Sequence, residues 1–460
     1  MNLEGKWQPK TEGEIREVIL TIKNVLLFTH SLKNYKERNR IIVGEKPPKE
    51  ILSDLNIKKL WRLYNNTVES ENLKVKESFF RKELNKNYNI GFGNPKSDVC
   101  STCLEFSEKM KNVKTEKEKS ELMIGKRIHT MKYNAFYSYL RQESENTISI
   151  SFDCQKNLLL PKLPDQSAYF SRQINAYNFT VTIGSSKSPL NKENVHIYTW
   201  NESDFVKGSN EIASALNHTL NNINLSDKNV LKLFADGCVG QNKNSIIIGM
   251  LSKWLLSAPL NLITVEIYFP VVGHSFLPPD RVFAKIEKET RKKEIILQPE
   301  TYNEILSDHG TVFQLGVDVP VLDWKAATRD TLKAVGSWHF QFSSAKRMFL
   351  FRRNGNIMIQ GEVSYKFNVG VPKSVLKRMK NLSIMRPQQI ERGQVSIKPE
   401  KIRDVCKLLE KHYGADWRQL QSLQFFVRIE DQLRENVKNV EEDEEIEQFC
   451  EPREEIDFSV

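Results

Sequence analysis

Four acidic residues stand where they could carry out chemistry on phosphates through bound metal ions. Asp153 and Asp236 each end an expected strand, "ISISFD" and "VLKLFAD". If these two strands pair, both aspartates end at the same rim of the sheet. Glu211 and Asp280 lie near the expected starts of two helices. Carboxylates that crowd together repel one another and need a multivalent cation between them. Oxygen ligands favour Mg²⁺ or Mn²⁺, and two such ions about 4 Å apart can clamp the attacking and leaving oxygens of a phosphoryl displacement.

The stretch after Asp236, "GCVGQNKN", is rich in small and amide residues. Gln241, Asn242 and Asn244 are the amide residues of this loop. Glu287 lies on the same helical face as Asp280, two turns on. Each residue taken singly is also explained by an ordinary turn or a favourable helix-dipole position.

A second candidate site contains cysteine. Cys100 and Cys103 form a Cys-x2-Cys pair, and His129 follows in the next helical stretch. These residues would supply three ligands of a structural zinc site, which needs four. No fourth ligand is evident, although His30 or a residue of another chain remains open. The alternative is two free thiols at a helix start. With six cysteines in 460 residues, the chain is not a disulfide scaffold.

The elements around the acids alternate between strand and helix. Residues 148–153 alternate strictly between apolar and polar, which predicts a strand, and "SAYFSRQ", "YNFTVTIG" and "VHIYTWNE" are further strand candidates. "GSNEIASALNHTLNNI" and "KNSIIIGMLSKWLLSA" predict helices on either side of the almost wholly apolar strand 230–236. "LITVEIYFPVV" predicts a last strand, and a helix follows from Pro279. This order predicts an α/β fold, with a mixed sheet and flanking helices over 147–294.

The flanking regions differ in character. Residues 1–143 are predicted to be helical and to include the Cys-x2-Cys pair. Residues 295–435 should form a small basic region of a β-hairpin around Asn354-Gly355 and a closing helical pair. Residues 436–460 should be an acidic, disordered tail.

The order of the acids resembles that of the ribonuclease H-like superfamily of nucleases, integrases and transposases. There an aspartate on the first strand, a glutamate on the first helix, an aspartate ending the fourth strand and an acid on the last helix bind two metal ions. "FDCQKNLLLPKLP", "YTWNESDFVKGSNEIAS", "DGCVGQNKN" and "GHSFLPPDRVFAKIEK", with "GFGNPKSDVCSTC" upstream, also resemble a large group of uncharacterised animal proteins found in or near transposable elements. Their core is thought to be ribonuclease H-like.

The resemblance implies a role for each acid. Asp153 and Asp236 would be the central metal ligands, with Asp280 the third and Glu211 a fourth. Glu287 would replace Asp280 if the last helix were registered differently. His274, six residues before Asp280, would assist proton transfer or product release. Gln241, Asn242 and Asn244 would hold the loop beside Asp236, or contact a phosphate or base. The resemblance therefore implies a transposon-derived protein with Mg²⁺- or Mn²⁺-dependent nuclease or transposase chemistry.

The charge of the chain indicates a polyanionic partner. The formal net charge is +10, but the stretch 441–457 holds ten acids and one arginine and so carries −9, which leaves +19 on the rest. Basic segments at 285–293, 345–354 and 372–381 would bind phosphates. We expect nucleic acid as the partner, DNA in preference to RNA, with a homo-oligomer left open. No apolar stretch or signal peptide indicates a membrane or secretion, so we expect an intracellular, nuclear protein.

Two other functions stay open. The chain could be a domesticated, non-catalytic nucleic-acid- or chromatin-binding protein, because relics of mobile elements often keep a fold after losing its activity. A purely structural protein–protein adaptor is the third reading.

Overall fold

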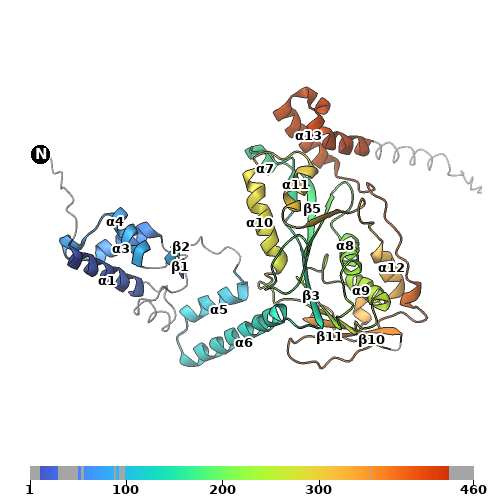
Figure 1. Cartoon of the computed structure of the whole chain (residues 1–460), viewed down its shortest axis with the longest axis horizontal. Coiled ribbons are helices and arrows are strands. Elements are labelled where there is room, and N and C mark those ends of the chain that lie inside the picture. The colour runs from blue at the N-terminus through green and yellow to red at the C-terminus, as the bar shows by residue number, and fades with distance from the viewer. Residues whose placement is uncertain are drawn as a thin grey trace, which may run out of the picture. The chain divides into compact units, whose positions relative to one another are not determined.

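The computed structural model describes residues 11–28, 50–52, 56–87, 90–92, 99–353 and 355–434 (Figure 1). The chain divides into two compact units, Met1–Val99 and Cys100–Val460. The sequence predicted a boundary near residue 143 instead. His30, Asn354 and the expected acidic tail lie outside the described residues. None of the described helices is long and apolar enough to cross a membrane.

The first unit is mainly helical, as the sequence predicted. Its described elements are α1 (Glu12–Phe28), β1 (Glu50–Leu52), α3 (Ile57–Thr67), the short 3₁₀ turn η1 (Glu71–Leu73), α4 (Glu77–Asn87) and β2 (Ile90–Phe92). Val18, Leu60, Tyr64 and Phe80 are buried together where the helices meet. The parallel pairing of β1 with β2 was not predicted, because three-residue strands carry no periodic signal.

The second unit is built on a mixed sheet, to which the described residues contribute nine strands in the order β11-β10-β8-β7-β3-β5-β6-β9, with β4 paired to β5. These strands are β3 (Thr147–Cys154), β4 (Leu158–Leu160), β5 (Ile174–Ile183), β6 (Val195–Asn201), β7 (Val230–Ala235), β8 (Thr264–Tyr268), β9 (Thr311–Gln314), β10 (Arg347–Arg353) and β11 (Asn356–Glu362). The predicted α/β class with a mixed sheet is confirmed.

The pairings place the first and central strands side by side. β3 runs parallel to β7, and β7 runs parallel to β8, whereas β5 is antiparallel to both β3 and β6. One strand prediction was wrong: most of "SAYFSRQ" forms the short helix α7 (Gln166–Phe170). Asp165 caps this helix by accepting a hydrogen bond of 3.1 Å from the Ser167 N–H, so the local cap outweighs the apolar content of the stretch.

Helices cover both faces of the sheet (Figure 1). On one face α8 (Ser209–Asn221), α9 (Ser245–Ser257) and α12 (Trp324–Thr331) bury the largest apolar cluster. The other face is covered by α6 (Glu116–Arg141), α10 (Pro278–Lys292), α11 (Pro299–Ser307) and α13 (Pro399–Tyr413). In Figure 1 this arrangement appears as β3 lying between α10 and the α8–α9 pair.

Packing explains why α5 (Ser101–Lys111) and α6 belong to the second unit. The Phe136 ring on α6 lies edge-on to Phe234 of β7, at 5.9 Å between centroids. Gly125 lets α5 approach α6, because a Cβ added there would lie 2.9 Å from the Phe106 ring. Helices α5 and α6 therefore form a hairpin, and α6 packs this hairpin on the sheet of the second unit.

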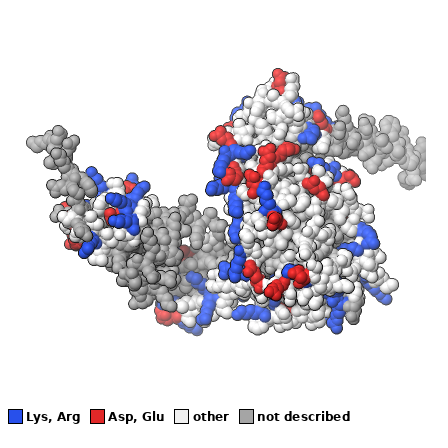
Figure 2. All heavy atoms as spheres, viewed as in Figure 1, with Lys and Arg blue, Asp and Glu red and all other residues white. Residues whose placement is uncertain are grey.

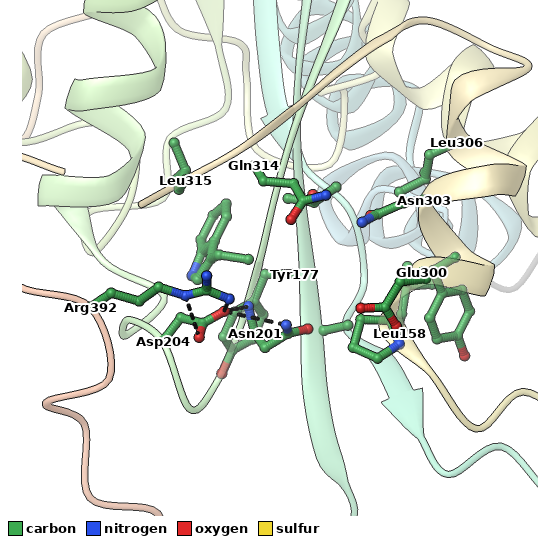
Figure 3. Close-up of a pocket in the computed structure, with 15 residues that line it drawn as sticks. Leu158, Tyr177, Asn201, Asp204, Glu300, Asn303, Leu306, Gln314, Leu315 and Arg392 are labelled. Carbon is green, nitrogen blue, oxygen red and sulfur yellow. Dashed lines mark hydrogen bonds and ion pairs between the residues drawn. The ribbon is translucent and has the colours of Figure 1, made fainter. Parts of the chain in front are cut away.

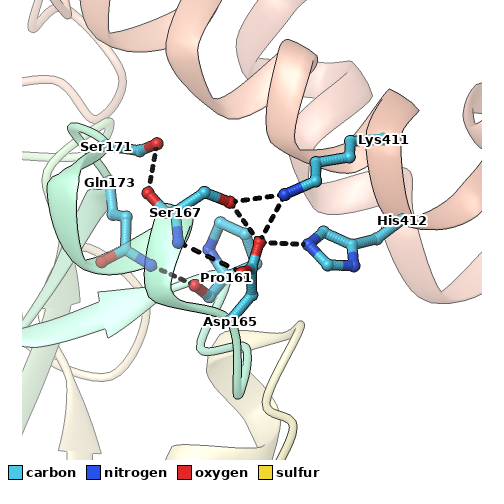
Figure 4. Close-up of polar contacts among 7 residues, drawn as sticks. All are labelled: Pro161, Asp165, Ser167, Ser171, Gln173, Lys411 and His412. Carbon is cyan, nitrogen blue, oxygen red and sulfur yellow. Dashed lines mark hydrogen bonds and ion pairs between the residues drawn. The ribbon is translucent and has the colours of Figure 1, made fainter.

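The C-terminal region adds to the sheet and covers one end of it. The predicted hairpin forms β10 and β11, and β10 pairs with β8, so it extends the main sheet. The predicted closing helices are α13 and residues 424–434, which follow the 3₁₀ turns η4 (Ala415–Gln419) and η5 (Gln421–Leu423). Lys411 and His412 of α13 pair with Asp165 at 2.9 and 3.0 Å. These contacts tie α13 to the start of α7 (Figure 4).

Candidate functional site

Asp153 and Asp236 lie beside each other at one rim of the sheet. The register of β3 and β7 pairs Phe152 with Ala235, and the two aspartates are the next residues along these strands. Adjacent strands are about 4.8 Å apart, so the two carboxylates start from neighbouring backbone positions. Side chains alternate between faces, and Phe152 and Ala235 belong to the cluster under α8 and α9. The aspartates therefore point to the face covered by α6 and α10.

Asp280 approaches the same region from the start of α10. Its Oδ2 accepts a hydrogen bond of 2.7 Å from the Leu277 N–H, which caps the helix. The helix packs against β3 and β5 through residues that include Val282 and Ile286. The packing of α10 thus brings its first turn toward the ends of β3 and β7.

Burial and neighbouring carboxylates shift the ionisation of Asp153 and Asp280. Burial and the Asp236 carboxylate raise the pKa of Asp153 to about 7, and Asp280 adds to this shift. Burial also raises the pKa of Asp280, with a further contribution from Asp236. All three side chains stay partly exposed, so solvent or an ion can reach them. A bound cation would relieve this repulsion and favour the charged forms.

Amide side chains of the following loop hold Asp236 and the start of α9. Asn242 is buried, and its Nδ2 donates to Oδ1 of Asp236 at 2.7 Å. The Asn244 Oδ1 accepts the N–H groups of Ile246 and Ile247 at 3.0 and 3.1 Å, so this residue caps α9. Gln241 is partly exposed in the same loop. These contacts organise the loop beside the carboxylate.

Glu211 and Glu287 lie apart from the three aspartates. Glu211 Oε2 accepts a hydrogen bond of 3.0 Å from the Gly208 N–H and caps α8, which lies on the opposite face of the sheet from α10. Burial raises the pKa of Glu211 to about 7, and Asp323 is the acid that adds to the shift. Glu287 is exposed and forms an ion pair of 2.6 Å with Arg291. The structure therefore groups Asp153, Asp236 and Asp280, without either glutamate.

Lys207 is a neighbour of the carboxylates that the sequence did not single out. Its Nζ donates to the Gln155 carbonyl at 3.0 Å and to the Asn157 Oδ1 at 2.8 Å. Its positive charge partly offsets the burial that raises the pKa of Asp153. A lone lysine between two predicted elements gives no periodic or motif signal that would have identified it.

Four ligand-bearing side chains meet at a separate place, here called the Cys/His cluster. It consists of Cys100, Cys103, His129 and His274, whose ligand atoms all lie within 4.8 Å of one another. The His129 and His274 Nε2 atoms are 3.1 Å apart, and the Cys103 Sγ is 3.3 Å from the His274 Nε2. The Cys100 Sγ is 3.5 Å from the His129 Nε2.

This geometry fits a tetrahedral metal ion. Zinc bonds of about 2.3 Å to sulfur and about 2.0–2.1 Å to nitrogen would separate the ligand atoms by roughly 3.3–3.8 Å. Burial lowers the pKa of both histidines, which favours the neutral form that binds metals. The Cys/His cluster could therefore hold a metal such as zinc.

The position of His274 differs from the one expected. The resemblance placed it as an assistant to the carboxylates, whereas its Nε2 faces Cys103 and His129 and supplies the fourth ligand atom that the sequence had left unassigned. A histidine so distant in sequence, on an irregular loop, offers no spacing pattern from which a shared site could be inferred.

Two cavities differ in what they could accept. The pocket in Figure 3 is lined by Asn303, Gln314 and the ion pair of Arg392 with Asp204, which measures 2.9 Å. Its volume is about 40 Å³, which is room for water molecules only. A recess of about 890 Å³ lies instead beside the loop that follows Asp236, between that loop and the aromatic segment 335–343. The larger open space therefore borders the loop after Asp236, but none of the three aspartates lines it.

Comparison with known proteins gives one family match. Residues 188–366 match the family model described as "Domain of unknown function (DUF7869)". The matched stretch runs from just before β6 to just beyond β11, so it contains Asp236, His274 and Asp280, while Asp153 and Cys100 precede it. No curated protein matches the chain. Over less than half of its length, the chain is thus similar to a family whose function is not known.

Proposed function

We propose that this protein is a divalent-metal-dependent nuclease of the ribonuclease H-like, transposase-derived type. One observation carries the proposal: Asp153, Asp236 and Asp280 approach one rim of the sheet from three elements, and burial with mutual repulsion raises the pKa of Asp153 to about 7. Such a grouping disfavours the charged apoprotein and favours a bound cation.

The strand order supports the ribonuclease H-like assignment. In that superfamily the aspartates of the first and fourth strands bind the same ions, which requires these strands to be adjacent. Here β3 is the first long strand of the sheet, β7 follows β5 and β6 in sequence, and the two pair in parallel. Helix α10, which follows β8 and has an acid at its start, lies over the same rim. The arrangement of this chain thus meets the requirement.

The donor set suits two Mg²⁺ or Mn²⁺ ions. Asp153 and Asp236 would be the central ligands and Asp280 the third, all through carboxylate oxygens. Ions bound there would activate water or a 3′-hydroxyl and stabilise the leaving oxygen. Asn242 and the Leu277 N–H each hold one oxygen of a ligand carboxylate in place. Glu211 keeps its helix-capping position and is left out of the ligand set.

A basic face of α10 supports nucleic acid as the substrate. Arg281, Lys285, Lys288 and Lys292 recur at spacings that place them on one side of the helix, opposite its buried residues. Figure 2 shows a column of basic side chains along the side of the large unit where Figure 1 places α10. In the described part of the chain, Nη2 of Arg281 is buried without a hydrogen-bond partner. A nucleic-acid backbone bound along this face would reach Asp280 at the start of the helix. If the substrate is DNA, the protein would act in the nucleus.

Cleavage assays test the proposal. Single-stranded DNA, duplex DNA, RNA and an RNA–DNA hybrid would be incubated with the full chain and Mg²⁺ or Mn²⁺. We expect cleavage of at least one substrate, and its loss in Asp153→Asn and Asp236→Asn. Asp330→Asn is the matched control, because Asp330 is exposed on α12, which packs on the opposite face of the sheet. Equal cleavage by all these variants would refute the assignment.

A non-catalytic nucleic-acid-binding protein is the second candidate. The observation that favours it is Lys207, whose charge reaches Asp153 and could balance the carboxylates without a metal ion. This candidate predicts salt-sensitive binding, no cleavage, and no change in binding for Asp153→Asn or Asp236→Asn.

A further inference from the structure

The loop between β8 and α10 connects the two candidate sites. His274 supplies its Nε2 to the Cys/His cluster, and the Leu277 N–H, three residues later, donates to Oδ2 of Asp280. The His274 N–H also donates to the Val271 carbonyl at 2.9 Å, which forms a tight turn. A displacement of His274 would therefore reach the first turn of α10 through a short stretch of backbone.

Phe269 and Leu277 anchor the two ends of the loop in apolar clusters, but its middle has few apolar contacts. Val272 and Phe276 are 82% and 60% exposed. Gly273, at φ 79°, packs so closely on Cys100 that an added Cβ would lie 2.8 Å from the Cys100 Cβ. The Cys100 Sγ also contacts the Val272 carbonyl at 3.5 Å. The position of the loop therefore depends strongly on the position of Cys100.

Helix α6 holds the loop from its other side. The Tyr133 ring stacks on the His274 ring at 4.0 Å between centroids, with 17° between the planes. The Tyr137 hydroxyl donates to the His274 carbonyl at 3.1 Å. His129, on the same helix, faces His274 through their Nε2 atoms. The loop is thus held between α5, which begins beside Cys100, and α6.

We propose that Zn²⁺ bound in the Cys/His cluster fixes this loop and thereby positions Asp280 in the carboxylate site. Two sulfur atoms and two imidazole nitrogens within 4.8 Å of one another form the donor set that a tetrahedral Zn²⁺ ion takes. When the ion is removed, the loop loses its main anchor and the Leu277–Asp280 contact loses its fixed geometry. The cluster side chains are positioning residues. The zinc site stands on its own contacts, whereas its effect at Asp280 rests on the proposed function.

The first test measures zinc and the loop directly. The full chain, purified with zinc, should contain one Zn²⁺ by elemental analysis, and Cys103→Ser should contain none. Hydrogen exchange should then be faster across residues 269–280 in Cys103→Ser, including the amides of His274 and Leu277. His129→Cys keeps four ligands and should keep both zinc and protection. Cys406→Ser, at a partly buried thiol on α13, is the matched control and should match the wild type.

The second test measures Mn²⁺ binding in the same preparations by electron paramagnetic resonance. We expect Cys103→Ser to weaken Mn²⁺ binding by about tenfold or more, which is typical when groups supporting a ligand are lost. Removing zinc from the wild type with a chelator, then adding it back, should lower and restore Mn²⁺ affinity. This reversal distinguishes positioning from unfolding of the α5–α6 hairpin. Asp153→Asn should lose Mn²⁺ binding but keep its zinc.

The outcomes separate the two proposals. Wild-type chain that binds no zinc, or zinc removal that leaves hydrogen exchange across 269–280 unchanged, would overturn the inference. Slower exchange with zinc but unchanged Mn²⁺ affinity would overturn the link to Asp280 and leave the proposed function standing. If the zinc-loaded wild type binds no Mn²⁺ at all, the proposed function fails and so does the role at Asp280, while the exchange data still decide whether zinc fixes the loop.

Discussion

The Asn242 side-chain amide donates a hydrogen bond of 2.7 Å to Oδ1 of Asp236. The Cys238 N–H donates to the same oxygen at 3.1 Å. Two donors therefore fix one oxygen of this carboxylate and leave Oδ2 for another partner. Because Asn242 is 1% exposed, solvent cannot easily replace its contribution. This support should matter for any ion that Asp236 binds.

Asn242→Ala should weaken Mn²⁺ binding by about 10- to 100-fold, because Asp236 would lose the donor that fixes its orientation. Titration of the full chain, followed by electron paramagnetic resonance, measures this effect. Asn356→Ala is the control, since Asn356 is exposed at the start of β11. Equal affinities of Asn242→Ala and the wild type would show that the carboxylate does not bind the ion or does not need this support.

The stability of the metal-free protein should fall as the pH rises toward about 7. Burial and Asp236 raise the pKa of Asp153 in the folded state to about 7, against an ordinary value of 3.8. Between these values the unfolded chain has released the proton that the folded chain keeps, so stabilisation is complete below about pH 4 and is lost as the pH rises through about 7. The upper limit of this loss is about 4 kcal/mol.

Asp153→Asn, which cannot ionise, should escape this loss. In buffer without Mg²⁺ or Mn²⁺, urea unfolding should show the variant more stable than the wild type near pH 8, with a smaller difference near pH 5. At high pH, added Mg²⁺ should raise the free energy of unfolding of the wild type. It should not raise that of the variant. Asp330→Asn serves as the exposed control. A difference between variant and wild type that is the same at both pH values would contradict the shifted ionisation of Asp153.

Local patterns predicted much of the sheet but not its full extent. Strict alternation in β3 and the apolar run of β7 identified both strands, and their pairing placed Asp153 beside Asp236 as expected. The hairpin β10–β11 was also predicted from Asn354-Gly355. Its addition to β8 was not, because strand pairing across a long connection depends on tertiary packing rather than on local sequence.

The candidate sites show the same limit. The position of Glu211 in the first turn of α8 was readable from the sequence, but the face of the sheet that α8 covers depends on how the chain crosses over. His274 was noticed as a loop histidine, yet its partners Cys103 and His129 come from a distant hairpin. Grouping by chemistry could suggest these residues, whereas only the packing of α6 on the sheet brings them together.

The basic face of α10 should carry much of the affinity for nucleic acid. Replacing Lys285, Lys288 and Lys292 by alanine together should weaken binding and lower the slope of log affinity against log salt by about two to three, because each lost phosphate contact removes about 0.9 from the slope. Fluorescence anisotropy with labelled DNA at several salt concentrations measures both quantities.

The control removes the same charge from the other face of the sheet. Lys325, Arg329 and Lys333 are exposed on or just after α12, which packs with α8 and α9. The variant with alanine at all three of these positions should keep most of the slope of log affinity against log salt. If both triple variants lower the slope equally, binding follows total charge rather than a track along α10.

Gly273→Ala should destabilise the second unit by about 1–3 kcal/mol, because φ is 79° and the added Cβ would lie 2.8 Å from the Cβ of Cys100. Gly336→Ala is the matched control: its Cβ would meet nothing within 4 Å, so we expect a change within about 0.5 kcal/mol. Urea unfolding of the zinc-loaded chain measures both. Equal stability of the two variants would mean that the loop can move away from Cys100 at little cost, which would also weaken the case that Cys100 determines the position of the loop.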